Sequence, residues 1–300
     1  MHEPFPSSAP PIVEIRRVTR QFGNKTALDD ISLTVPRGGV FGLIGGNGAG
    51  KTTLIKHILG MYKTQSGCVR VFGLDPVQNP VGTLGRIGYL SEDRDLPNWM
   101  RVGELMRYTQ AFYPNWDEVY AEELRQAFDL DAKTRIKNLS RGQRARAGLL
   151  VALAHRPELL VLDEPSSGLD PVVRRDILGA IIRTIADEGR TVLFSSHLLD
   201  EVERVADRVA IIHQGRILLT APMDEIKDTH RRVTLRFGQI HERPPSLVGT
   251  ISIEGQGAEW SYICSGESGQ LRRAAEAIGA TVVGDDALTL DEIFVSRIQG

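Results

Sequence analysis

The sequence predicts an α/β protein in which helices cover a mainly parallel sheet. Short apolar runs alternate with segments of helical spacing along much of the 300 residues, a pattern typical of such a sheet. The run 159–162 is wholly apolar, as expected for a strand buried on both faces, and two carboxylates follow it. The run 40–44 leads into a glycine-rich turn and then a helix. Both polar segments therefore follow the carboxyl ends of strands, where α/β sheets bind ligands.

Composition and charge exclude several classes of protein. The chain is 41% hydrophobic and 25% charged, which is ordinary for a globular protein, and its formal net charge of −2 does not favour binding to nucleic acid or to an anionic membrane. No apolar run approaches the roughly 20 residues that cross a bilayer. Residues 1–11 lack the features of a signal peptide and are expected to be a disordered lead. Cys68 and Cys264 are expected to be small core residues in a reducing compartment.

Strand candidates lie on both sides of the glycine-rich turn. Those expected in this part of the chain are 12–18, 31–35, 40–44, 68–71 and 87–90. From 102 to 130 apolar residues recur at helical intervals and aromatic side chains are frequent, so a helical subdomain is expected at about 93–150. Its aromatic side chains fit either a small core of its own or a docking surface.

Helices and strands alternate after this subdomain. Ser140 is expected to cap a helix that runs to about Ala154, and Asp170 to cap another that starts at Pro171. The strands expected here are 159–162, 191–196, 209–212 and 216–219. His197 follows the second of them.

A smaller α+β unit is predicted for residues 223–300. Its expected strands are 233–237, 251–253, 260–262 and 281–283, and its expected helices are 271–278 and 290–298. A proline-containing linker at 241–246 interrupts it. No catalytic constellation is visible in this part, so we interpret it as an accessory domain and residues 12–222 as the domain that carries the chemistry.

The glycine-rich turn has the pattern G-x-x-x-x-G-K-[ST]. Its residues are Gly45, Gly46, Asn47, Gly48, Ala49, Gly50, Lys51, Thr52 and Thr53. Glycines allow successive backbone N–H groups to point at one centre, to which the helix N-terminus adds partial positive charge, so phosphate is the expected ligand. Lys51 would neutralise the outer phosphates, and the Thr52 hydroxyl would ligate Mg²⁺. The pattern alone also fits an ordinary glycine-rich turn whose lysine points into solvent.

Residues 12–222 resemble the ATP-binding subunit of an ATP-binding cassette (ABC) transporter, which implies a P-loop NTPase core. The segment 45–53 is similar to the Walker A loop, and 159–164 to Walker B with its following glutamate. Residues 139–143 resemble the family signature L-S-G-G-Q, with arginine in its third place, and 167–170 resemble the D-loop. This ordered set is far more specific than a phosphate loop alone.

The resemblance implies a role for each polar residue near the nucleotide. Asp163 would hold the Mg²⁺ shell, and Glu164 would orient or deprotonate the attacking water. His197 would contact the γ-phosphate, and adenine would stack on Phe22. Glu92 stands where the family usually has glutamine, and it would act as a further Mg²⁺ ligand with an additional negative charge.

The signature implies that one chain forms only half of each site. Ser140, Gly142 and Gln143 would close over the nucleotide held by a second ATPase subunit, identical or homologous, with Asp170 at the same interface. ATP would join the two subunits and hydrolysis would release them. The small C-terminal unit and the loop at Glu92 resemble the branch that serves ABC-2-type exporters. The run 112–117 is similar to cassettes linked to antibiotic stress.

These likenesses predict an ATPase subunit that powers a separate integral membrane permease, an exporter of drug, antibiotic or lipid-like substrates. The protein would be cytoplasmic, peripheral on the inner face of the cell membrane, and in contact with the membrane only through the permease. One alternative is a soluble ABC ATPase acting on ribosomes or DNA, although paired cassettes and long coiled coils are missing from the sequence. Another is a non-hydrolysing regulatory module, which the catalytic residues disfavour.

Overall fold

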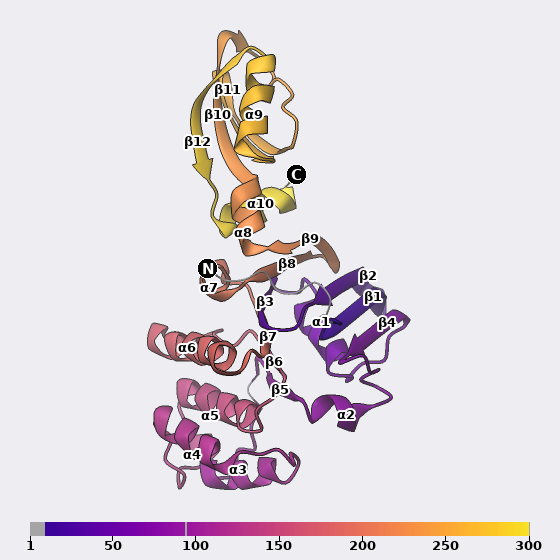
Figure 1. Ribbon diagram of the computed structural model, residues 1–300, viewed down its shortest axis with the longest axis vertical. Coiled ribbons are helices and arrows are strands. Elements are labelled where there is room, and N and C mark those ends of the chain that lie inside the picture. Colours follow the sequence, from indigo (N-terminus) through magenta and orange to yellow (C-terminus); the bar gives the residue numbers. More distant parts are fainter. Residues whose placement is uncertain (1–9, 94, 300) are drawn as a thin grey trace. The chain divides into compact units, whose positions relative to one another are not determined.

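The computed structural model describes residues 10–93 and 95–299, which fall into two compact units divided between Thr220 and Ala221 (Figure 1). The disordered lead expected at 1–11 lies mostly outside the described residues. Of that segment, Pro10 and Pro11 precede the first strand without regular structure.

A six-stranded sheet forms the centre of the first unit, in the order β5-β6-β7-β3-β8-β9. The strands are β3 (Gly39–Ile44), β5 (Ile87–Leu90), β6 (Leu159–Asp163), β7 (Thr191–Ser196), β8 (Arg208–His213) and β9 (Arg216–Pro222). Strands β5, β6, β7, β3 and β8 run parallel. Every residue of β3, β6 and β7 is buried, as the uninterrupted apolar runs predict.

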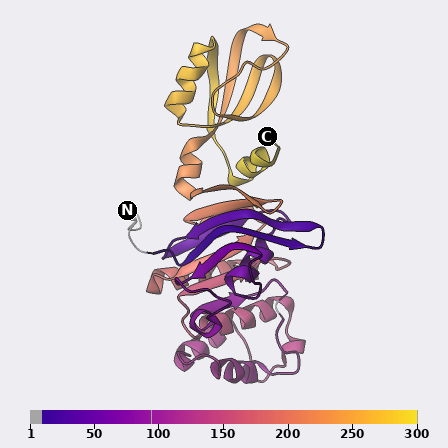
Figure 2. The same ribbon diagram turned by 90° about the vertical axis from the view of Figure 1, so that its right-hand side faces the viewer.

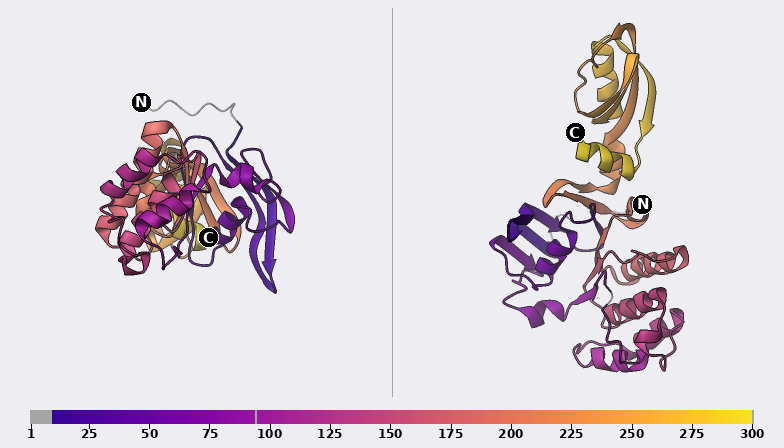
Figure 3. Two further views of the ribbon diagram at one scale, coloured as in Figure 1. Left: turned by 90° about the horizontal axis from the view of Figure 1, so that it is seen from below. Right: turned by 180° about the vertical axis from the view of Figure 1, so that it is seen from behind.

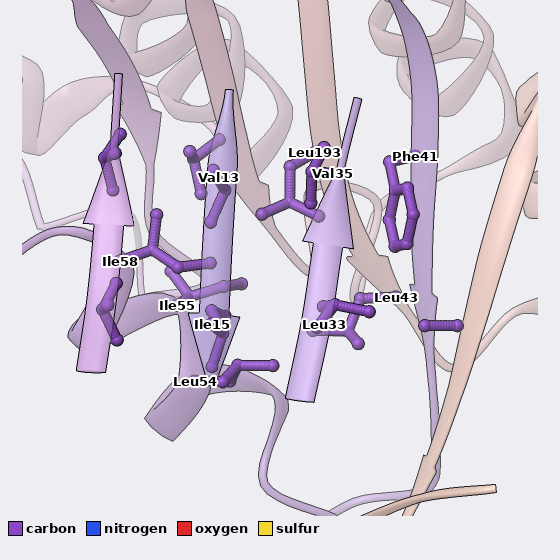
Figure 4. Packing of buried hydrophobic residues seen from close by; sticks show 14 of the residues in the cluster. Val13, Ile15, Leu33, Val35, Phe41, Leu43, Leu54, Ile55, Ile58 and Leu193 are labelled. Carbon is purple, nitrogen blue, oxygen red and sulfur yellow. The ribbon is translucent and has the colours of Figure 1, made fainter. Parts of the chain in front are cut away.

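A second, antiparallel sheet in the order β2-β1-β4 lies beside the first, and Figure 2 looks onto it. It consists of β1 (Val13–Phe22), β2 (Lys25–Val35) and β4 (Ser66–Val71). Helix α1 (Lys51–Ile58) packs its apolar face between the two sheets. Figure 4 shows the resulting core, in which side chains of α1 meet those of both sheets. The start of α1, and with it the glycine-rich turn, is thereby fixed on both sides.

Five helices of the first unit lie on the side of the central sheet away from the antiparallel strands (Figure 3). They are α3 (Val102–Gln110), α4 (Glu118–Ala127), α5 (Arg141–Leu153), α6 (Pro171–Glu188) and α7 (Leu199–Val205). Helix α2 (Pro80–Leu84) lies instead on the side of the antiparallel strands, and a 3-10 turn, η1 (Ile136–Asn138), precedes α5. Helices α3 and α4 pack on α5, which packs on β5. The helical stretch expected at 102–130 is interrupted between α3 and α4, where Pro114 has no N–H to continue a helix.

The second unit contains an antiparallel sheet in the order β11-β10-β12. Its elements are α8 (Met223–Thr229), β10 (His230–His241), β11 (Thr250–Ser265), α9 (Ser268–Ala277), β12 (Ala280–Ala287) and α10 (Leu290–Gln299). Helix α9 packs on the sheet over a core that includes Leu235, Tyr262 and Leu271.

Three local expectations differ from the structure. The segments 251–253 and 260–262 belong to one strand, β11, because pairing continues at Gly257 through glycines that hide the alternation. The sequence does not predict the short helices α2 and α8, because each has too few turns to show a helical period. The prediction that Cys68 is a core residue is wrong: Cys68 is exposed on β4, whereas Cys264 is buried as expected.

Acid should weaken the first unit through His155, which is 2% exposed and stacks on Tyr113 at 3.8 Å. Burial lowers the pKa of His155 from 6.5 to about 4. The unfolded chain therefore binds more protons between these values, and the free energy of unfolding falls as the pH drops through that window, by about 2 kcal/mol between pH 7 and pH 5. His155→Gln removes the titrating group and can still donate a hydrogen bond to Ile87 O. Urea unfolding at pH 7 and pH 5 should therefore show a loss of unfolding free energy about 2 kcal/mol smaller in His155→Gln than in the wild type. His213→Gln is the control, and an unchanged loss in His155→Gln would contradict the assignment.

Candidate functional site

A pocket of about 330 Å³ opens above the glycine-rich turn in the first unit. The turn contributes most of its wall, β1 and β2 contribute one side, and two carboxylates close the other. Its lining residues are Phe22, Lys25, Ala27, Asn47, Gly48, Ala49, Gly50, Lys51, Thr52, Thr53, Glu92 and Glu164.

Two glycines of the turn are required by close backbone contacts. A Cβ at Gly45 would lie 2.4 Å from Ile212 O. Gly50 has φ +116°, and a Cβ there would lie 2.7 Å from Ala27 O. Gly215, in the turn between β8 and β9, donates its N–H to Ala49 O at 2.9 Å. Neighbouring strands thus hold the turn close to the sheet, while Gly46, Asn47 and Gly48 are exposed toward solvent.

Lys51, the first residue of α1, is a buried cation, 5% exposed. Its Nζ donates to Gly45 O at 2.5 Å and to Gly46 O at 3.1 Å, and it lies 3.0 Å from Glu164 Oε1. Glu164 is itself 4% exposed, so the two charges neutralise each other within the protein. A buried charge without such a partner would be strongly unfavourable.

Asp163 and Glu164 leave the end of β6 in different directions. Asp163 is the last strand residue, and Glu164 turns away with φ +48°, a conformation that costs energy outside glycine. Ser195 of β7 connects them, because its Oγ donates to Asp163 Oδ1 at 2.7 Å and accepts the Glu164 N–H at 3.0 Å. Burial raises the pKa of Asp163, while hydrogen bonds from Ser195 and Thr52 lower it. Asp163 Oδ2 is buried without a hydrogen-bond partner among the described residues.

His197 lies next to the same glutamate. Its Nδ1 donates to Glu164 Oε2 at 2.7 Å, and its backbone N–H approaches that oxygen at 3.4 Å. Lys51, Glu164 and His197 therefore form one chain of contacts, drawn from α1, the end of β6 and the end of β7.

Glu92 stands at the rim of the pocket, just past β5. Partial burial raises its pKa, and the negative charges of Glu164, Asp163 and Asp93 raise it further, while Lys51 lowers it. This carboxylate is thus close enough to the other two to be repelled by them.

Phe22 forms the opposite rim, at the end of β1. Its side chain is 40% exposed, and its ring makes an edge contact with Tyr62 at 5.6 Å. The Arg20 guanidinium lies 4.6 Å from the Phe22 ring centre and 4.9 Å from that of Tyr62. Phe22 thus lines the pocket with an apolar ring that a guanidinium also contacts.

The signature residues do not line this pocket. Ser140 caps α5, accepting the Gln143 N–H at 3.1 Å while Gln143 Oε1 accepts the Ser140 N–H at 3.0 Å. Gly142 is buried where a Cβ would lie 2.7 Å from Val173. Asp170 is exposed and accepts the N–H groups of Val172 and Val173 at the start of α6. Ser140 and Asp170 are thus exposed outside the pocket, whereas Gly142 is buried beneath them in the contact of α5 with α6.

Sequence reasoning missed two features of the site. Ser195 was recognised only as part of a strand end, yet it hydrogen-bonds both carboxylate residues. Arg141, the departure from the signature, donates from Nη1 to Gly168 O at 3.4 Å and so links α5 to the loop after Glu164. A polar residue inside an apolar strand was the available signal for Ser195; nothing local indicated the partner of Arg141.

Known proteins are similar to this chain in sequence and fold. The profile of the ABC transporter family matches residues 28–167. The chain is 32% identical over 223 residues to the bacitracin transport ATP-binding protein BcrA of Bacillus licheniformis, covering 74% of this chain and 73% of that protein. This chain belongs to the ATP-binding proteins of ABC transporters.

The likeness to this ABC family extends beyond the matched profile. The ABC transporter ATP-binding protein YtrB of Bacillus subtilis is 24% identical over 289 residues, which cover 96% of this chain and 99% of YtrB. A solved ATP-binding subunit of an ABC transporter superposes with a TM-score of 0.66 and 28% identity, covering 72% of this chain and 92% of that one. The P-loop NTPase fold expected for the first unit is confirmed, and the chain is an ABC ATPase that binds ATP. Within the described residues, no helix is both long enough and apolar enough to cross a bilayer.

Ser195→Ala should damage the pocket without touching its surface. The change leaves the buried Glu164 N–H and Asp163 Oδ1 without their shared partner, which should lower the free energy of unfolding by about 1–3 kcal/mol. ATPase activity should fall as well, because Glu164 loses the bond that holds its backbone. Urea unfolding and steady-state ATPase assays measure both effects, and Ser32→Ala, at an exposed serine of β2, is the control. Wild-type behaviour of Ser195→Ala would refute this role.

Proposed function

We propose that this ABC ATPase binds Mg·ATP in the pocket, pairs with a second ATPase subunit around it, and drives a separate membrane permease. The observation that carries the proposal is the convergence of Lys51, Asp163, Glu164 and His197 from three separate segments at the glycine-rich turn. In this proposal residues 12–222 are the ATPase domain, with a helical subdomain at about 93–150, and residues 223–300 are accessory.

The turn is suited to hold the phosphates of ATP. Its exposed backbone, from Gly46 to Gly48, and the N-terminus of α1 supply N–H groups and partial positive charge. Lys51 would exchange Glu164 and the two carbonyls for phosphate oxygens. That exchange would release Glu164 to contact water, and Phe22 would stack on the adenine.

The donor set fits Mg²⁺. Asp163 Oδ2 is buried and unpartnered within the described parts of the chain, Thr52 reaches the same carboxylate, and Glu92 adds an oxygen at the rim. Hard oxygen ligands of this kind suit Mg²⁺, which binds through few side chains together with phosphates and water. When bound, the ion would neutralise charge on the phosphates. No group of three acidic, histidine or cysteine side chains among the described residues forms a complete metal cage, as expected if phosphates complete the shell.

Glu164 and His197 are suited to position the attacking water. Glu164 is held by backbone and side-chain bonds from Ser195 and His197, so its carboxylate direction is fixed. A water beside it would be oriented and deprotonated, with His197 contacting the γ-phosphate. Positioned general bases of this type contribute about 10²–10⁴ in rate.

A second subunit would complete the site. Ser140 and Asp170 are exposed, and neither lines the pocket of its own chain. The capped N-terminus of α5, followed by Gly142 and Gln143, is suited to approach phosphate, but it can do so only from another copy or a homologue. A two-fold pair would bury two nucleotides, and its opening and closing would supply the movement passed to a partner.

A groove in the first unit is suited to a permease. It has a volume of about 710 Å³ and lies between α2 and the segment from α3 toward α4. Tyr108 and Phe112 line it with exposed rings, 51% and 63% accessible, that contact each other at 5.1 Å. Exposed aromatic side chains in a groove mark an interaction site, and a short apolar helix of a permease fits it. The expected docking surface is favoured over a core for these two side chains. Similarity to BcrA, a bacitracin transport ATP-binding protein, supports an exporter of antibiotic-like substrates.

Glu164→Gln is the direct test of the catalytic assignment. Because the amide cannot take a proton from water, ATP turnover should fall by about a hundredfold or more, while ATP binding is retained. The variant should also accumulate as a dimer in Mg·ATP, measured by light scattering after size exclusion. The exposed Glu276→Gln is the matched control. A full ATPase rate in Glu164→Gln would refute the role of Glu164; a monomer that binds ATP would refute the pairing and favour a regulatory module.

Phe112→Glu tests the permease groove. A charge in the groove should abolish recovery of an integral membrane protein when the tagged chain is isolated in mild detergent from its native host. ATPase activity of the isolated chain should be unchanged. Val119→Glu, on α4 at 71% exposure and outside the groove, is the control. Recovery of ribosomes or DNA in place of a membrane protein would favour the soluble alternative.

A further inference from the structure

The loop 165–170 joins the glutamate of the pocket to α6. Its backbone is tightly turned, with the Ser167 N–H donating to Glu164 O and the Leu169 N–H to Ser166 O, both at 3.1 Å. Its last residue, Asp170, lies on the exposed surface that we assign to subunit pairing. Any shift of this loop would therefore move Glu164 and the pairing surface together.

A buried carboxylate outside the pocket hydrogen-bonds the start of this loop and lies near an arginine that hydrogen-bonds its end. Glu201 of α7 is 4% exposed and accepts a hydrogen bond from the Ser166 hydroxyl, which is itself buried. Its other oxygen, Oε1, lies 3.8 Å from Arg174 Nη1, and Arg174 Nε donates to Leu169 O at 3.1 Å. Glu201 thus contacts the start of the loop directly and reaches its end through Arg174.

Helix α7 fixes the backbone of Glu201 against the central sheet. The helix begins two residues after His197 and contacts β3 and β7 of the central sheet. Val202, beside Glu201, is fully buried against Gly42 of β3. A Cβ at position 42 would lie 2.5 Å from the Val202 side chain, so a larger residue there would displace it. The side chain that holds the loop is therefore anchored to the same sheet that positions His197.

The burial of the Glu201 carboxylate is unfavourable by itself. Desolvation raises the pKa of Glu201, whereas the Ser166 bond and the charge of Arg174 favour its ionised form. Burying a carboxylate costs free energy that an apolar side chain would not, so its stabilising contribution is small at best. Its directed contacts to the loop are what an apolar residue would fail to supply.

We propose that Glu201 is a positioning residue for ATP hydrolysis, which holds the loop 165–170, and through it Glu164, in the orientation that the reaction requires. The inference rests on the proposed role of Glu164. Misplacing a reacting group by about 1 Å can cost a hundredfold in rate, so a partly released loop should cost about tenfold. ATP binding, which depends on the turn 45–53, should be unaffected.

The test uses the full chain and separates turnover from binding. Ser166→Ala and Glu201→Ala should each lower kcat about tenfold, with the dissociation constant of a non-hydrolysable ATP analogue within about twofold of wild type. The double variant should be no slower than the slower single variant, because both remove the same hydrogen bond. Asp200→Ala, one residue away and exposed, is the matched control.

Glu201→Gln keeps an acceptor for the Ser166 hydroxyl and the shape of the side chain, so kcat should stay within about threefold of wild type. It also provides the comparison if Glu201→Ala fails to fold, as does Ser166→Ala, which removes a single oxygen. Four results would each overturn the proposal. Ser166→Ala could keep the wild-type kcat, or the variants could lose analogue binding in parallel with kcat. The effects could add in the double variant, or Glu201→Gln could be as slow as Ser166→Ala. If the proposed function itself were wrong, Glu164→Gln would keep its rate, an outcome distinct from all of these.

Discussion

The contact between Lys51 and Glu164 is the interaction on which the rest of the site depends. Two opposite charges, both at least nine-tenths buried, lie 3.0 Å apart at the base of the pocket. Neither would be stable there alone, so each requires the other until a ligand replaces one of them. In the proposed function, triphosphate would be such a ligand, because its negative charge would take the place of Glu164 beside Lys51. The same exchange would leave the carboxylate available to water, so that binding would also prepare the site for hydrolysis.

The fold supplies the rigidity that this exchange requires. Lys51 begins α1, whose apolar face is fixed between two sheets (Figure 4). Glu164 and His197 directly follow the adjacent strands β6 and β7. Side chains at the ends of paired strands keep their spacing, because the hydrogen bonds of the sheet hold the strands about 4.8 Å apart. The antiparallel sheet adds Phe22 at the pocket rim. In the proposed function the two sheets would therefore share the binding of the base and of the phosphates.

Much of this architecture could be predicted from the sequence. The features that could not be predicted all depend on contacts between residues far apart in the chain. Uninterrupted apolar runs identify β3, β6 and β7, and the phosphate-loop pattern with the ordered motifs identifies the family. The register of β1 with β2 and β4 could not be predicted, because it depends on contacts between residues far apart in the sequence. The bonds of Ser195 to Asp163 and of Arg141 to Gly168 are of the same kind. Periodicity reports which face of an element is buried, and it carries no information about which polar atom the buried face will meet.

The balance of charges in the pocket determines how Glu92 would affect nucleotide binding. Asp163, Glu164 and Glu92 stand opposite the single Lys51. Partial burial raises the pKa of Glu92, the neighbouring carboxylates raise it further, and Lys51 lowers it. A glutamine at this position would remove that repulsion, as the usual family pattern does. The carboxylate is tolerable if a divalent cation enters with the nucleotide and restores the balance. In the proposed Mg·ATP site, Glu92 would therefore make nucleotide binding more dependent on Mg²⁺ than the amide would, since without the ion a third negative charge would face the phosphates.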